Sequence, residues 1–130
     1  MTRSFFLLLV GILLLLPAGC TRGPYEVVPF SGTVTWQGKP VPDLAIFFEP
    51  EVGRPSNGVT DENGRFTMIY TVKRNGVQKG KGKFYFEGNR MIGDGDSGQF
   101  AEIFKKYSRD NTPLLLDVQK PEKNYELKLE

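Results

Sequence analysis

The sequence predicts a mainly β protein, an antiparallel seven-stranded β-sandwich with a short helical insertion, preceded by a signal peptide. Beyond residue 29, short segments alternate apolar with polar residues and are rich in β-branched and aromatic side chains. Turn-forming Gly, Pro, Asn and Asp separate these segments at intervals typical of all-β sandwiches. An apolar stretch also precedes the single cysteine of the chain.

Residues 1–19 have the layout of a secretory signal peptide. Arg3 gives a basic start, residues 5–16 are almost entirely apolar, and Ala18 and Gly19 are small. The apolar stretch is shorter than the roughly 18 to 20 residues that a helix needs to cross a bilayer. The pattern therefore favours a signal peptide over a permanent membrane span.

Cys20 cannot form an internal disulfide, and the sequence has no histidine to activate its thiol as a nucleophile. The segment "LPAGC" resembles a bacterial lipobox, whose cysteine is linked to diacylglycerol before cleavage just ahead of it. The resemblance implies a mature chain that begins at Cys20 and is tied to the membrane by its acyl chains. Pro17 departs from the motif, which usually has an aliphatic residue there. The alternative is ordinary cleavage after Ala18 or Gly19, which leaves a free thiol.

We expect a secreted, lipid-anchored protein of the cell envelope. Thr21 stands where an aspartate would retain an enterobacterial lipoprotein at the inner membrane, so the outer membrane or the cell surface is favoured. Residues 20–29 contain two prolines and no amphipathic period, which predicts a lipid-anchored linker. Residues 30–130 then form one β-sandwich domain, because this length suits a single core.

Seven segments carry the strand pattern, and two turns separate the first four of them. Leu44, Ile46 and Phe48 alternate toward one face, and Phe84 and Phe86 are expected to point inward. We expect residues 57–60 and 65–72 to form a hairpin around the turn "DENG", in which Asn63 or Gly64 takes a positive φ. The predicted strands are residues 30–36, 43–49, 57–60, 65–72, 82–87, 114–118 and 125–129.

Charge gives no indication of a nucleic-acid partner, since 17 basic residues nearly balance 15 acidic ones. Lys79, Lys81 and Lys83 alternate, so an extended chain directs them to one side. A cluster of this kind is either a polyanion site or a solvated strand edge protected from aggregation. The edge interpretation is favoured.

One segment departs from the strand pattern. Phe100, Ile103, Phe104 and Tyr107 recur at helical spacing, and Ser97 is a candidate N-cap. A helix of two or three turns is marginal alone, so its aromatic stripe has to pack against something. The stripe either covers an open end of the sandwich, which is favoured, or binds a partner.

Three segments carry a family resemblance: "SGTVTWQGKPVPDLAIFFEP", "GVTDENGRFTM" and "GVQKGKGKFYF". They resemble the transthyretin-like, carboxypeptidase-regulatory-like fold. With the lipobox and the distal "KKYSRDNTPLLLDVQKPEKNYELKL", the chain is similar to small lipoproteins of planctomycete-type bacteria. The shared positions are turn and core residues, so the resemblance implies a fold and says little about activity. A long glycine-rich loop over residues 87–100 and Trp36 depart from the family pattern.

Two pairs of carboxylates were considered as sites. Asp94 and Asp96 resemble the start of a calcium loop, but Gly98 and Lys105 stand where an EF-hand needs further ligands, so a surface loop is the favoured alternative. A glycosidase pair made of Glu49 and Glu51 is weighed against two solvated side chains, which are favoured.

The expected function is non-catalytic and needs no cofactor. Without histidine, and with Cys20 in the anchor, serine triads, cysteine nucleophiles and most zinc sites are excluded. A tethered module would bind an envelope protein or polysaccharide through aromatic residues, and the candidates are Trp36, Phe100, Phe104 and Tyr107. The alternatives are a structural envelope component without a specific ligand and, less favoured, a carboxylate-based hydrolase.

Overall fold

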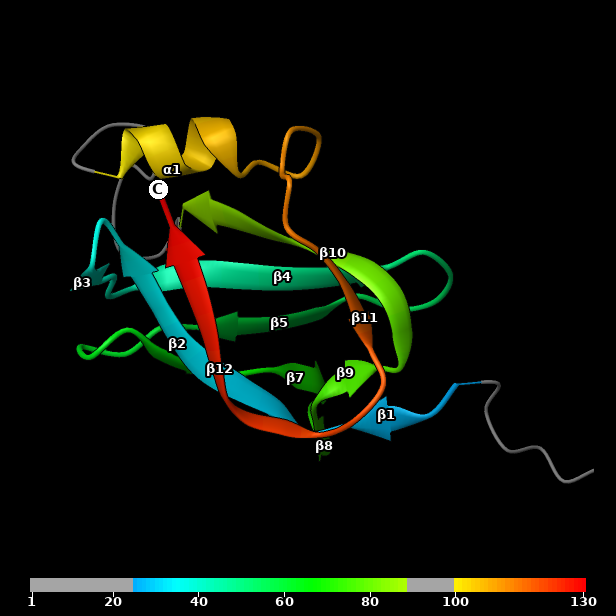
Figure 1. Cartoon of the computed structure of the whole chain (residues 1–130). Coiled ribbons are helices and arrows are strands. Elements are labelled where there is room, and N and C mark those ends of the chain that lie inside the picture. The colour runs from blue at the N-terminus through cyan, green and yellow to red at the C-terminus, as the bar shows by residue number, and fades with distance from the viewer. Residues whose placement is uncertain (1–24, 89–99) are drawn as a thin grey trace, which may run out of the picture.

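The computed structural model describes residues 25–88 and 100–130. These residues form short strands and one short helix (Figure 1). The strands are β1 Val27–Val28, β2 Phe30–Trp36, β3 Lys39–Pro40, β4 Leu44–Pro50, β5 Ser56–Val59, β6 Arg65–Thr67, β7 Ile69–Thr71, β8 Arg74–Asn75, β9 Val77–Gln78, β10 Gly80–Gly88, β11 Leu115–Val118 and β12 Glu122–Leu129, and the helix is α1 Ala101–Lys106.

The protein is mainly β, as predicted, and most of its strand pairs are antiparallel. One sheet has the order β11-β10-β4-β5-β7-β8, and a second has β12-β2-β3 with β6 also paired to β2. Strands β1 and β9 form a small separate pair. The β2–β12 pair is parallel, so the arrangement is not antiparallel throughout.

A single core lies between the two larger sheets. Leu44, Ile46 and Phe48 of β4 are buried, and so are Phe84 and Phe86 of β10, as the alternation predicts. The second sheet contributes side chains from β2, β6 and β12, namely Phe30, Val34, Phe66, Leu127 and Leu129. Two layers around a shared core are consistent with a β-sandwich.

The predicted strand over residues 65–72 forms in two parts, because the chain changes sheet at Met68. The amide of Met68 donates to Phe30 O at 2.9 Å, while its carbonyl accepts from the amide of Gly76 at 2.7 Å. Strand β6 therefore pairs with β2, and β7 pairs with β5 at Asn57 and Ile69. The expected simple hairpin between 57–60 and 65–72 is wrong in this respect, since the two halves of the second strand belong to different sheets.

The turn before β6 forms as predicted. Asp61 Oδ1 accepts from the amides of Asn63 and Arg65 at 2.8 and 2.9 Å, and Gly64 has a φ of 73°. Val34 N donates to Gly64 O at 2.8 Å. The turn is therefore closed by its own aspartate and held against β2.

Two further expectations are corrected. Val27 and Val28, assigned to the linker, are buried and pair with β9, because β-branched valines suit a strand and their burial removes apolar surface from water. Lys81 and Lys83 do not border a free strand edge, because β10 pairs with β11 on one side and with β4 on the other. Lys79 lies between β9 and β10, and its amide donates to Glu26 O at 2.8 Å. The candidate cap Ser97 lies outside the described residues, and α1 starts after Phe100 with no side-chain cap.

Gly32 marks a close approach between β2 and β12. A Cβ atom at this position would overlap the carbonyl oxygen of Tyr125 and lie 3.1 Å from Cζ of Phe66. The parallel pairing of β2 with β12 therefore requires glycine here.

We predict that Gly32→Ala lowers the free energy of unfolding by about 1–3 kcal/mol, because β12 has to shift away from β2 to make room for the methyl group. Urea unfolding followed by tryptophan fluorescence measures the change. Thr33→Ala, at the next position of β2, is the control and should cost less. Equal losses in the two variants would show that the close approach is not the cause.

Candidate binding site

Trp36 lies at the end of β2, where a tight turn reverses the chain. Gln37 and Gly38 both have positive φ angles, 51° and 80°, and the amide of Gln37 donates to Leu129 O at 3.0 Å. This hydrogen bond therefore holds the turn, which leads from β2 into β3, against the end of β12. It leaves the half-buried indole of Trp36 at this end of the sandwich, packed against the core.

The helix α1 covers the same end of the sandwich (Figure 1). It places Phe100 with its ring centroid 6.1 Å from that of Trp36, at an interplanar angle of 62°. This edge-to-face arrangement is favourable for aromatic pairs. The sequence marked Trp36 and the helical aromatic residues as separate candidates, and the structure brings the two together.

A hollow of about 580 Å³ opens between Trp36 and α1, and we call it the Trp36 cleft. Its walls combine one indole with charged and amide side chains, which is a composition suited to a polar ligand. Lys106 Nζ donates to Glu130 O at 2.6 Å and so closes one side. The lining residues are Trp36, Glu102, Ile103, Lys105, Lys106, Tyr107, Asn111 and Glu130.

The other aromatic residues of the helical stripe mainly support this site. Tyr107 is 4% exposed, its ring meets Phe86 edge to face, and its hydroxyl accepts from Glu130 N at 3.0 Å. Phe100 and Phe104 are partly buried against the core and do not line the cleft. The stripe thus covers the end of the sandwich, as favoured from the sequence, and Trp36 supplies the cleft's half-buried aromatic surface.

Three candidate site residues, Cys20, Asp94 and Asp96, lie outside the described residues. Within residues 25–88 and 100–130, no group of three or more acidic residues is placed to hold a metal ion. In the same ranges, no helix is both long and apolar enough to span a bilayer.

Sequence reasoning missed the ion pair between Glu49 and Arg109, which are 60 positions apart. The guanidinium contacts both carboxylate oxygens, with Nε–Oε2 at 2.7 Å and Nη2–Oε1 at 2.9 Å. Lys83 Nζ also donates to Arg109 O at 2.7 Å, so the loop after α1 is fixed to the sheet through both residues. No local pattern signals this pair, because its members meet only after the strands have assembled.

Glu49 and Glu51, the candidate hydrolase pair, both line a second hollow of about 510 Å³ together with Lys81, Lys83 and Asp117. The hydrogen bonds from Arg109 lower the pKa of Glu49 below its ordinary value of 4.5, and burial only partly opposes them. A general acid for glycoside hydrolysis needs a raised pKa instead. Glu49 is therefore unsuited to act as the general acid, and both of its carboxylate oxygens are held by Arg109 in a bidentate ion pair.

We predict that Arg109→Gln flattens the acid dependence of stability. In the native chain the lowered pKa of Glu49 stabilises the fold above pH 4.5, and this contribution is lost as the pH falls through the lowered value. The variant lacks the hydrogen bonds that lower this pKa. Its free energy of unfolding should therefore change less between neutral and acidic pH, as measured by urea unfolding over a pH series.

The matched control for this prediction is Lys128→Gln, which removes an exposed pair with Glu126 at 3.4 Å. An exposed pair contributes little to stability, so the control should follow the acid profile of the native chain. An Arg109→Gln profile parallel to that of the native chain would contradict the role given to the Glu49 pair.

No family model, curated protein or solved structure matches this chain. The observations from which a function can be argued are therefore the fold and the Trp36 cleft.

Proposed function

We propose that this chain is a lipid-anchored, non-catalytic module of the cell envelope that binds a polysaccharide in the Trp36 cleft. The observation that carries the proposal is the half-buried indole of Trp36 at the wall of a cleft lined by polar side chains. The C–H face of a sugar ring packs on a flat aromatic ring, while carboxylate, ammonium and amide groups bind its hydroxyls. Both kinds of group are present here.

The polar side of the cleft is varied in its chemistry. Glu102 provides a hydrogen-bond acceptor, Lys105 a donor and Asn111 both. Asn111 Nδ2 also donates to Lys105 O at 3.4 Å, which orients the amide at the end of the helix. A neutral or zwitterionic sugar fits this balance better than a strongly charged polymer.

A polysaccharide is favoured over an envelope protein because the cleft has no large exposed apolar side chain. The large apolar residues that are exposed in the described part of the chain are Tyr25, Val52, Val59, Ile69, Val72 and Leu115, and none lines the cleft. The buried centre of a protein–protein interface is usually more apolar than the surface around it.

The proposed fold type is transthyretin-like, as in the small planctomycete-type lipoproteins that the sequence resembles. In support, the glycines of the shared motifs have structural roles: Gly32 admits β12, Gly38 forms the turn after β2, and Gly64 forms the turn before β6. These roles explain the motif without a catalytic site.

The proposed anchor is Cys20, and the intact mass of the chain extracted from its membrane fraction tests it. We expect a mature chain that starts at Cys20 and carries the added mass of its acyl groups, with the N-terminal peptide sequenced by fragmentation. An unmodified N-terminus would show that Pro17 prevents processing of the lipobox, and the chain would then be a free secreted domain.

We predict that Trp36→Ala weakens binding to envelope polysaccharide about tenfold or more, which corresponds to the loss of at least about 1.4 kcal/mol of ring contact. Co-sedimentation with insoluble cell-wall polysaccharide measures the binding. Since the chain has one tryptophan, its emission should also change saturably when soluble glycan is added to the native protein.

The control for this prediction is Tyr25→Ala, which removes an exposed aromatic ring near β1 and should bind like the native chain. Thermal unfolding shows that each variant is folded. If the native chain binds no envelope glycan, or if Trp36→Ala binds as well as the native chain, the polysaccharide proposal is wrong. The structural envelope role then becomes the better account.

A further inference from the structure

One end of the domain lies near β1, at the opposite end of β2 from Trp36 (Figure 1). Two loops at this end carry exposed apolar side chains. Val72 is fully exposed in the two-residue turn between β7 and β8, and Val52 is largely exposed in the loop after β4. Tyr25, just before β1, is 38% exposed. A fully exposed valine at the tip of a turn contributes nothing to the core, so these side chains are available for an external contact.

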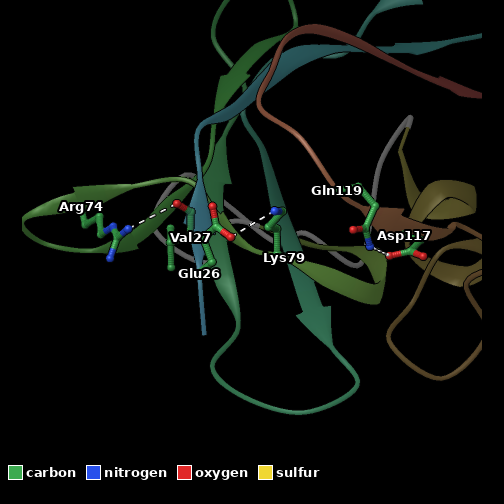
Figure 2. A network of polar contacts seen from close by, with 6 residues as sticks. All are labelled: Glu26, Val27, Arg74, Lys79, Asp117 and Gln119. Atoms are coloured by element: carbon green, nitrogen blue, oxygen red, sulfur yellow. Dashed lines mark hydrogen bonds and ion pairs between the residues drawn. The ribbon is translucent and has the colours of Figure 1, made fainter. Parts of the chain in front are cut away.

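One loop is held against β1 and the other against β9, the strand that pairs with β1. Arg74 Nη2 donates to Val27 O at 3.3 Å, which fixes the β7–β8 turn beside β1, as Figure 2 shows. Gln78 Nε2 donates to Val52 O, and Gln78 is itself paired with Val27 across the β1–β9 ladder. β1 is therefore linked to both loops, directly to the β7–β8 turn and through β9 to the loop after β4, and we call these segments together the β1 end.

The β1 end is basic. Residues 25–28, 51–55 and 71–79 contain four basic side chains, Arg54, Lys73, Arg74 and Lys79, and two acidic ones, Glu26 and Glu51. Glu26 is paired with Lys79 at 3.0 Å (Figure 2). Exposed valines among basic residues suit the surface of an anionic bilayer, where apolar tips enter the headgroup region and ammonium or guanidinium groups approach phosphates.

The sequence also limits the distance between the β1 end and the proposed anchor. Residues 21–24 stand between Cys20 and Tyr25. Even a fully extended chain of this length reaches only about 18 Å. A chain acylated at Cys20 must therefore keep β1 close to the membrane surface.

We propose that the β1 end lies on the bilayer, with Val52 and Val72 in the headgroup region and Lys73 and Arg54 toward anionic phosphates. This inference rests on the lipid anchor of the proposed function and adds to it a fixed orientation of the domain. The anchor alone permits any tilt, whereas contact through the β1 end directs the Trp36 cleft away from the membrane.

The test uses the full chain, acylated at Cys20 and reconstituted in vesicles of phosphatidylcholine and phosphatidylglycerol. Because the sequence has one cysteine, and its sulfur is blocked by the lipid, Val72→Cys provides a single free thiol for the polarity-sensitive dye NBD. The matched control is Val59→Cys, an exposed valine of β5 on the outer face of the sheet. We expect brighter, blue-shifted emission from the dye at position 72 and water-like emission at position 59.

A second variant tests the role of charge. Lys73→Gln, made in the Val72→Cys chain, should reduce the blue shift in vesicles that contain phosphatidylglycerol and leave it unchanged in phosphatidylcholine alone. Because attraction to an anionic surface is screened, the same loss should appear in the parent variant at high salt.

The outcomes separate the two proposals. If the chain remains with the vesicles but positions 72 and 59 both show water-like emission, the orientation is wrong and the anchor stands. If the chain does not remain with the vesicles, and mass spectrometry finds no acyl group on Cys20, the anchor and the orientation are both wrong.

Discussion

The structure depends on the packing of Phe84 between the two sheets. Its ring centroid lies 4.9 Å from that of Phe48 in the same sheet and 5.4 Å from that of Phe30 in the opposite sheet. In a chain without disulfides, burial of such rings is the main source of stability. These contacts join the two sheets, and α1 covers the core that lies between them at the end of the sandwich where the Trp36 cleft opens.

Local pattern was enough to predict the longer strands and their inward faces. Leu44, Ile46 and Phe48 follow the period of two that is typical of a strand. The turn before β6 is predictable because the aspartate and the glycine that form it are close together in the sequence. Partners could not be predicted in this way. The change of sheet at Met68 and the central position of β10 depend on strands that are far away in the sequence.

The sequence also does not show which candidate site residues meet in space. Trp36 and the helical aromatic residues were each marked by residue type, but their meeting in one cleft depends on the end of β2 reaching α1. Tyr85 is buried on the outer face by stacking on Phe47, which alternation alone does not predict, and this burial raises its pKa. The Glu49–Arg109 ion pair likewise cannot be predicted from the local sequence, because its two residues meet only when the sheet has formed.

The parallel pairing of β2 with β12 joins the first long strand of the domain to the last one. One sheet therefore cannot be completed until residues 122–129 are free to add to it, however early the preceding strands are made. Contacts between such distant segments slow folding. If the chain is exported, as we propose, a polypeptide that still lacks its closing strand is not yet folded and can pass through a translocation channel, and β12 then completes the sheet on the far side.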